Sequence, residues 1–195
     1  AEVKGQATAD GRAAIVVAQT FGSVKLESVI VKDSKLEGVQ KIGGLIGFVH
    51  EGKVEVSDCT VEGLTLNSIE LAGETGATGG LIGYINQGNN KITNSYVKSS
   101  TLNLIQSVNE AKRANGEFIG IIAGTSHTEI TNCGVEGNIF NNSIEWTPFH
   151  NPLIGANRGD QAILTINGKA YPEAIPDYED KGGYYEVYTA EGLLK

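Results

Sequence analysis

The sequence contains no methionine, only two cysteines, and no proline before residue 148. Because proline interrupts the hydrogen bonds of a sheet, its absence leaves residues 1–147 free to form many strands. No apolar stretch reaches the length that spans a bilayer, so we expect no direct membrane insertion. Since Ala1 is not a translational start, we expect an upstream segment, such as a secretory signal, to have been removed.

Basic residues are also few, with 15 Lys and Arg against 23 Asp and Glu, which gives a net charge of −8. Phosphate backbones need a basic surface, so this balance argues against nucleic acid as a partner. The two cysteines, Cys59 and Cys133, fit neither a zinc motif nor a disulfide-rich scaffold. We expect no metal site and no cofactor.

Repeats are the main feature that the sequence does contain. Gly-Gly-Leu-Ile-Gly-Phe at 43–48 returns as Gly-Gly-Leu-Ile-Gly-Tyr at 79–84. Offsets of 30, 36 and 38 residues align four segments that begin at Val24, Val54, Asn90 and Thr128. The aligned positions form three apolar columns and one column of small residues, as a stacked core requires. These columns are Leu26/Val56/Ile92/Ile130, Val31/Val61/Val97/Val135, Leu36/Leu66/Leu102/Phe140 and Val29/Cys59/Ser95/Cys133.

Two further columns carry charges that alternate in sign from one repeat to the next. Opposite charges on adjacent strands attract and like charges repel, so the alternation indicates that each repeat is one coil of a stack. Parallel crossovers are almost always right-handed, so we expect a right-handed coil. These columns are Lys25/Glu55/Lys91/Glu129 and Lys32/Glu62/Lys98/Glu136.

Between the apolar columns the alternation slips by one residue, at Ser28, Asp58, Asn94 and Asn132. Asn and Asp tolerate the left-handed conformation of a tight bend, so this column predicts a corner of the coil. A structural ladder of side chains is the favoured interpretation, and a calcium or substrate site is the alternative. The two cysteines have Ser95 between them, so they should be too far apart for a disulfide.

Together these patterns predict an all-β fold, a right-handed parallel β-helix of about five rungs within residues 1–170. The atypical fifth rung, at 153–168, reads as the end of the solenoid. Residues 171–195 contain two prolines and the acidic run 177–180, and we interpret them as a linker or tail that begins a following module. Within that tail, residues 184–188 have strand propensity and 189–194 resemble the start of a helix.

With Gly-Gly-Leu-Ile-Gly and Ser/Thr-Asp/Asn-Cys-x-Val-x-Gly in place, the chain resembles the GLUG-motif repeats of bacterial surface proteins. The resemblance covers residues 43 to about 140 and departs at 119–123, where the doubled glycine is missing. It implies an extracellular location on the bacterial cell surface and a non-enzymatic, adhesin-like role. Implied partners are a glycan or a host or matrix protein, and adjoining modules of the same polypeptide.

Binding residues are expected in the inserts that follow the third apolar column, because repeat proteins often place such inserts on one face. The candidates are Trp146 and His150 in one insert and Glu110 and Arg113 in another. Trp146 could be a sugar-stacking platform, although a hydrophobic plug under the inserts is the favoured interpretation. We identify no catalytic residues, since the carboxylates alternate with lysines. The alternatives are a rigid spacer and a fragment of a β-helix polysaccharide lyase or hydrolase.

Overall fold

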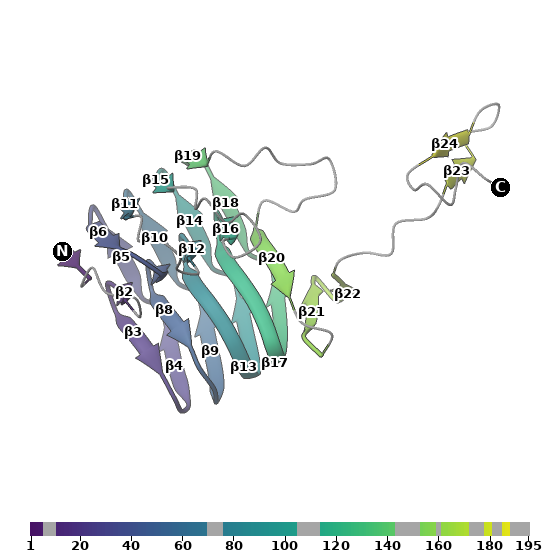
Figure 1. Cartoon of the computed structure of the whole chain (residues 1–195), viewed down its shortest axis with the longest axis horizontal. Coiled ribbons are helices and arrows are strands. Elements are labelled where there is room, and N and C mark those ends of the chain that lie inside the picture. Colours follow the sequence, from purple (N-terminus) through teal and green to yellow (C-terminus); the bar gives the residue numbers. More distant parts are fainter. Residues whose placement is uncertain are drawn as a thin grey trace.

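The structure is a computed structural model, and it describes residues 1–5, 11–69, 76–104, 114–142, 153–158, 161–171, 178–180 and 185–187. These residues form strands and turns, and none of them lies in a helix. Nearly all of the strands stack in parallel into four sheets that surround one core, as Figure 1 shows. The chain is an all-β parallel β-solenoid, which confirms the predicted fold class.

Three of the four sheets contain only short strands, about one from each turn of the solenoid. Sheet A consists of β1 (Glu2–Lys4), β6 (Lys35–Gly38), β11 (Thr65–Ser68), β15 (Thr101–Leu104) and β19 (Ile139–Asn142). Sheet D consists of β5 (Ile30–Lys32), β10 (Thr60–Glu62), β14 (Tyr96–Lys98) and β18 (Gly134–Glu136).

The other two sheets follow the glycine motif. Sheet B consists of β2 (Arg12–Ala14), β7 (Lys41–Gly43), β12 (Ala77–Gly79) and β16 (Ala114–Gly116). Sheet C consists of β3 (Val17–Thr20), β4 (Val24–Glu27), β8 (Ile46–Val49), β9 (Lys53–Ser57), β13 (Ile82–Thr93), β17 (Ile119–Thr131), β20 (Ile154–Arg158), β21 (Ile163–Ile166) and β22 (Lys169–Ala170). In the third and fourth turns one long strand, β13 or β17, replaces a pair of shorter ones.

Each turn of the solenoid passes through sheets B, C, D and A in that order, and the structure contains about four such turns. The sequence predicts about five rungs. The fifth segment does add β20 and β21 to β17, but both strands belong to sheet C alone. The chain then reverses, because β22 pairs antiparallel with β21. The last rung is thus an incomplete turn. The right-handed winding stays a prediction.

The strand pairings confirm the register that the repeats predict. Leu26 lies opposite Val56, which lies opposite Ile92, and the other apolar columns continue in the same way from turn to turn. In the second and third turns these side chains are almost completely buried. The hydrophobic core is therefore a set of straight columns along the axis of the solenoid.

Glycine is required where sheet B meets sheet C, because successive turns come very close there. A Cβ on Gly44 would lie 2.3 Å from the carbonyl oxygen of Gly80. A Cβ on Gly80 would lie 2.3 Å from that of Glu117, which takes the second glycine's place in the fourth turn. Since Ile82 pairs with Ile119, the glycine at 120 aligns with the third glycine of the motif and not with the second. The insert before this motif thus ends earlier than the sequence alignment predicts.

The predicted corner is confirmed by backbone angles. Ser28, Asp58, Asn94 and Asn132 have φ of 56°, 53°, 48° and 52°, all in the left-handed region. A second left-handed corner follows five residues later, at Asp33, Gly63, Ser99 and Gly137, with φ of 45°, 65°, 47° and 62°. We missed this second corner, although its column of small, turn-forming residues is visible in the same alignment.

In the small-residue column, Cys59, Ser95 and Cys133 of successive turns lie next to one another. The Cys59 amide donates to Ser95 Oγ at 3.1 Å, and the Ser95 amide donates to Cys133 Sγ at 3.5 Å. Both cysteines are free thiols, as predicted. Cys59 is fully buried, whereas Cys133, in the fourth turn, is only partly buried. Burial raises the pKa of both thiols above the ordinary value.

Beyond the solenoid, β23 (Tyr178–Asp180) and β24 (Tyr185–Val187) pair antiparallel. The strand predicted at 184–188 is therefore present. The acidic run, expected to be part of a linker, instead supplies β23, because a neighbouring strand is available for it to pair with. The predicted helix start at 189–194 lies outside the described residues.

Candidate functional site

The four predicted binding residues, Trp146, His150, Arg113 and Glu110, lie outside the described residues. The strands that precede the long inserts are β11, β15 and β19, which are neighbours in sheet A. All three inserts therefore leave the solenoid at the same corner, as predicted.

The described residues form a hollow on the outer face of sheet C, which we call the polar groove. Its volume is about 350 Å³. It spans the second, third and fourth turns, on β9 and the C-terminal halves of β13 and β17. The lining residues are Lys53, Glu55, Asn89, Asn90, Lys91, His127 and Glu129.

Strand alternation explains why the groove is polar. Along β9, Val54 and Val56 face the core while the residues on either side of each face outward. The parallel register then sets Lys53, Asn89 and His127 in one outward column. Glu55, Lys91 and Glu129, from the first charged column, lie beside it. The groove is therefore a direct product of the repeat, and its members could be identified from the alignment.

One end of this face is internally ion-paired. Lys53 Nζ lies 2.5 Å from Glu55 Oε1, and Lys25 Nζ lies 2.7 Å from Glu27 Oε2. Both pairs form within a strand and not between turns, although the predicted register of the charged column is correct. The hydrogen bond from Lys53 lowers the pKa of Glu55, and the hydrogen bond to Glu27 raises the pKa of Lys25.

The centre of the groove differs from that end. Within the part of the chain that the structure describes, no side-chain hydrogen bond or ion pair is formed by Asn89, Lys91, His127 or Glu129. Two donors, an imidazole and a carboxylate thus lie side by side in one hollow with their polar atoms free. Such a set can hydrogen-bond the hydroxyl and carbonyl groups of a polar ligand.

The second charged column, on sheet D, forms its pairs between turns. Lys32 Nζ lies 3.5 Å from Glu62 Oε2, and Lys98 Nζ lies 3.1 Å from Glu136 Oε2. Lys98 also lies 4.9 Å above the ring of Tyr96. These charged side chains form ion pairs with one another and help to set the register of the stack. They are therefore poor candidates for ligand contacts.

The corner column forms a ladder of hydrogen bonds. Asn94 Nδ2 donates to Asp58 Oδ1 at 3.1 Å, and Asn132 Nδ2 donates to Asn94 Oδ1 at 2.8 Å. The backbone N–H of Asn132 in turn donates to Asn167 Oδ1 at 2.9 Å. The described residues contain no cluster of three His, Cys, Asp or Glu that could hold a metal ion. These contacts favour the structural interpretation of the corner over the calcium site.

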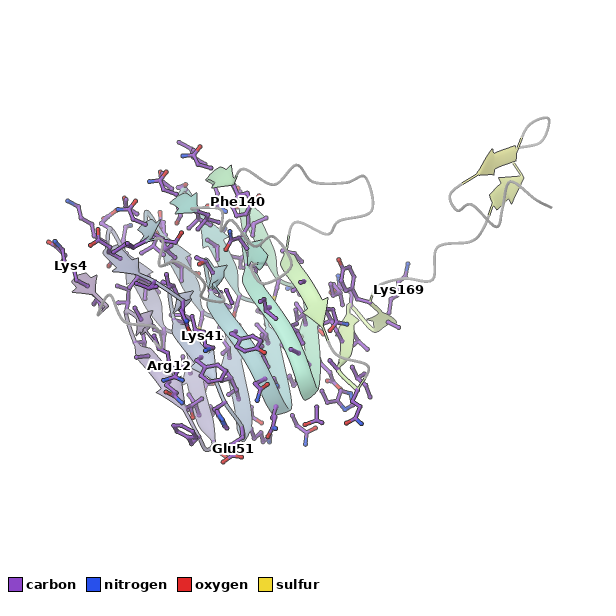
Figure 2. All side chains as sticks on the ribbon, viewed as in Figure 1. Lys4, Arg12, Lys41, Glu51, Phe140 and Lys169 are labelled. Carbon is purple, nitrogen blue, oxygen red and sulfur yellow. The ribbon has the colours of Figure 1, made fainter. Side chains whose placement is uncertain are left out.

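A cluster of aromatic rings lies where sheets B and C meet, and sequence reasoning did not single it out. The Phe48 and Tyr84 rings are stacked, with centroids 5.3 Å apart and planes 8° apart. Lys41 Nζ lies 4.8 Å from the centre of the Phe48 ring, and Arg12 Cζ lies 5.2 Å from it. Figure 2 shows Arg12 and Lys41 on this side of the solenoid. The signal was the aromatic residue that closes each of the two glycine motifs.

No family model matches the chain, and neither the curated proteins nor the solved structures contain a match. The described residues also include no helix long and apolar enough to span a membrane. The fold is thus established as a β-solenoid without assignment to a family.

Proposed function

We propose that this chain is a non-enzymatic binding module of an extracellular bacterial surface protein, adhesin-like in the manner of the GLUG-motif repeats, and that it holds a glycan in the polar groove. The observation that carries this proposal is the set of free polar side chains at the centre of the groove. The other charged column, on sheet D, is ion-paired, and so are Lys25 and Lys53. The centre of the groove is therefore the place where a ligand gains hydrogen bonds without breaking existing ones.

A glycan suits the groove because its hydroxyls both donate and accept hydrogen bonds. Lys91 and Asn89 supply donors, Glu129 and the Asn89 carbonyl supply acceptors, and His127 supplies one of each in its neutral form. The solenoid holds the backbone of these residues on strands, so binding has to order only their side chains. The inserts that carry Trp146 and His150 stay a second predicted contact surface, and a host or matrix protein stays a second class of ligand.

The test is a glycan array with the purified chain, followed by affinity measurements on the glycans that it retains. Lys91→Ala should weaken binding about tenfold, since a hydrogen bond to a charged group is worth about 1.5–3 kcal/mol. Lys25→Ala is the matched control, because Lys25 stands in the same column outside the groove and pairs with Glu27. Equal effects of the two variants would contradict the assignment to the groove. An array without any retained glycan would favour the rigid spacer or a protein ligand.

The grouping of Lys91, His127 and Glu129 also favours a second candidate, a polysaccharide lyase or hydrolase. Such an enzyme needs a base together with a charged group that stabilises the reacting sugar. Against a hydrolase, the hydrogen bond from Lys53 lowers the pKa of Glu55, whereas the general acid of such an enzyme has a raised pKa. A screen of acidic and neutral polysaccharides for new reducing or unsaturated ends decides this, with His127→Ala as the variant that should abolish any activity found.

A further inference from the structure

The N-terminal end of the solenoid is an open sheet edge. The strands β2, β3, β4 and β5 are the outermost members of sheets B, C and D. Among the described residues, only β1 lies beyond the first turn, and it pairs with β6 in sheet A alone. Figure 1 shows β3 and β4 at this end of the stack without a neighbour on their outer side. No strand within the described ranges pairs with the outward-facing backbone groups of β3 and β4, so another strand can pair with them.

The core is open at the same end. Val16 takes the position that Leu45 takes in the second turn, because Ala14 pairs with Gly43 and Val17 pairs with Ile46. Leu45 is completely buried, whereas Val16 is 42% exposed. Val17, Val24, Leu26 and Val29 are also only partly buried, although they head columns whose next members are fully enclosed. Core positions are thus available to apolar side chains from outside.

Exposed apolar residues collect on this turn. Val16, Phe21 and Ile30 are three of the five large hydrophobic residues that are exposed in the described part of the chain, and the second and third turns contain none. Natural edge strands are usually blocked by proline, by a bulge or by a covering segment. The opposite end of sheet C has such a device in the antiparallel strand β22. The first turn has none among the described residues.

The charges at this edge indicate which charges a binding partner must carry. Lys25 and Lys32 are the outermost members of the two charged columns, and each is followed by a glutamate in the second turn. Continued alternation calls for acidic residues on the other side of the edge as well. A second copy of this chain supplies an acidic residue, Glu136, in the second column but none in the first. Its first charged column ends in Thr165, under the hairpin of β21 and β22, and pairing two N-terminal edges would bring lysines from both copies together.

We propose that the edge formed by β2–β5 binds a parallel turn of another β-solenoid module, one that carries acidic residues in both charged columns. A single straight strand cannot satisfy this edge, because the edge bends through three sheets and has core positions along it. A solenoid turn follows the same bends and covers Val16 and Leu26 with its own apolar column. Modules would then join end to end, with a continuous core and continuous sheets across the junction.

Peptides copied from this chain provide the probe. The acidic peptide consists of residues 53–68, with Cys59 replaced by Ser, and it carries Glu55 and Glu62 in the charged columns. The basic peptide consists of residues 89–104 and carries Lys91 and Lys98 at the equivalent positions. The full chain should bind the labelled acidic peptide at least about tenfold more tightly than the basic one, because both facing charges change from attractive to repulsive. Hydrogen exchange should slow at residues 24–32 when the acidic peptide binds, because residues 53–62 are the ones that face this segment in the second turn.

The charge-swapped chain Lys25→Glu/Lys32→Glu should reverse this preference, and Lys91→Ala, which alters only the groove, should leave it unchanged. Slower exchange at β20–β22 instead of at β4 and β5 would overturn the proposal, as would equal binding of the two peptides or no binding of either. Sedimentation of the chain alone tests whether a second copy of the chain binds this edge instead. A dimer that dissociates on Val16→Lys substitution would show that a second copy takes the edge, contrary to the proposal.

Discussion

Equivalent core positions in the first and second turns of this solenoid have different environments. Leu26 in the first turn is half-buried, whereas Val56, directly opposite it in the second turn, is 1% exposed. Leu36 belongs to the first turn as well, yet it is 1% exposed, because Val3 of β1 lies opposite it on the outer side. Burial in a solenoid thus depends on having a neighbouring turn on both sides, and the same side chain contributes differently to stability at an end and in the middle.

The largest expected change in the free energy of unfolding comes from the removal of a core side chain in an interior turn. Leu66 is completely buried between Leu36 and Leu102, so Leu66→Ala should lower the free energy of unfolding by about 3–5 kcal/mol, through lost burial and an unfilled cavity. Leu26→Ala, in the open first turn, should lower it by less than half as much. Urea unfolding followed by circular dichroism measures both. Similar losses would mean that the first turn is covered in solution.

The next effect comes from the glycine motif. In Gly80→Ala the new methyl group would meet the Glu117 carbonyl oxygen at 2.3 Å and Val97 Cγ1 at 2.8 Å, so the backbone of two turns must separate. We expect a loss of about 2–3 kcal/mol, typical of overpacking. Gly22→Ala is the matched control at the open end, where no atom lies within 4 Å of the added Cβ.

Because alanine also reduces the freedom of the unfolded chain, Gly22→Ala should be neutral or slightly stabilising. The comparison of these two glycines is therefore a direct measure of how closely the interior turns are stacked. A Gly80→Ala protein as stable as the parent would show that the turns are spaced more widely than the structure has them.

A smaller effect is expected at the corner. Asn94 combines a φ of 48° with hydrogen bonds to side chains in the turns on either side. Asn94→Ala should cost about 1–2 kcal/mol, because alanine adopts this conformation less readily and makes neither bond. Asn94→Gly should recover part of the loss, since glycine relieves only the backbone strain. If the glycine variant is no more stable than the alanine variant, the hydrogen bonds carry the whole effect.

Much of this fold follows from the sequence alone, because the alignment of the repeats gives the register in which their strands pair. The alternation of Lys25, Glu55 and Lys91 indicates one turn per repeat without any structural information, and the strand pairings agree. The number of turns is less predictable. Residues 153–168 have the pattern of a rung, but whether they complete a turn depends on where the chain goes afterwards, and the hairpin of β21 and β22 is not visible in a repeat pattern.

The candidate site depends on details that a repeat pattern does not determine. The insert residues were chosen for their side-chain types, and they lie outside the described residues. For Glu55, Lys91 and Glu129 of the groove, the alternation of charge in their column predicts paired side chains. The strand register determines which charged residues lie opposite one another. It does not determine which of several nearby charges a long exposed side chain pairs with. Glu55 takes Lys53 from its own strand, which leaves Lys91 free, and sequence spacing gives no information on that choice.

The smallest expected effect tests the charged column on sheet D, again by comparing an interior with a terminal position. Glu62 stands between Lys32 and Lys98, whereas Glu136 has a lysine on one side only. Glu62→Lys replaces attraction by repulsion on both sides, so it should lower the free energy of unfolding by up to about 1 kcal/mol, and Glu136→Lys by about half of that. Both losses should shrink when salt is raised from about 0.01 M to 1 M, as screening shortens the range of the repulsion from about 30 Å to about 3 Å. Urea titrations at the two salt concentrations measure this. Equal losses at the two positions, or losses that salt does not change, would show that these charges act through packing of their side chains and not through their alternation along the stack.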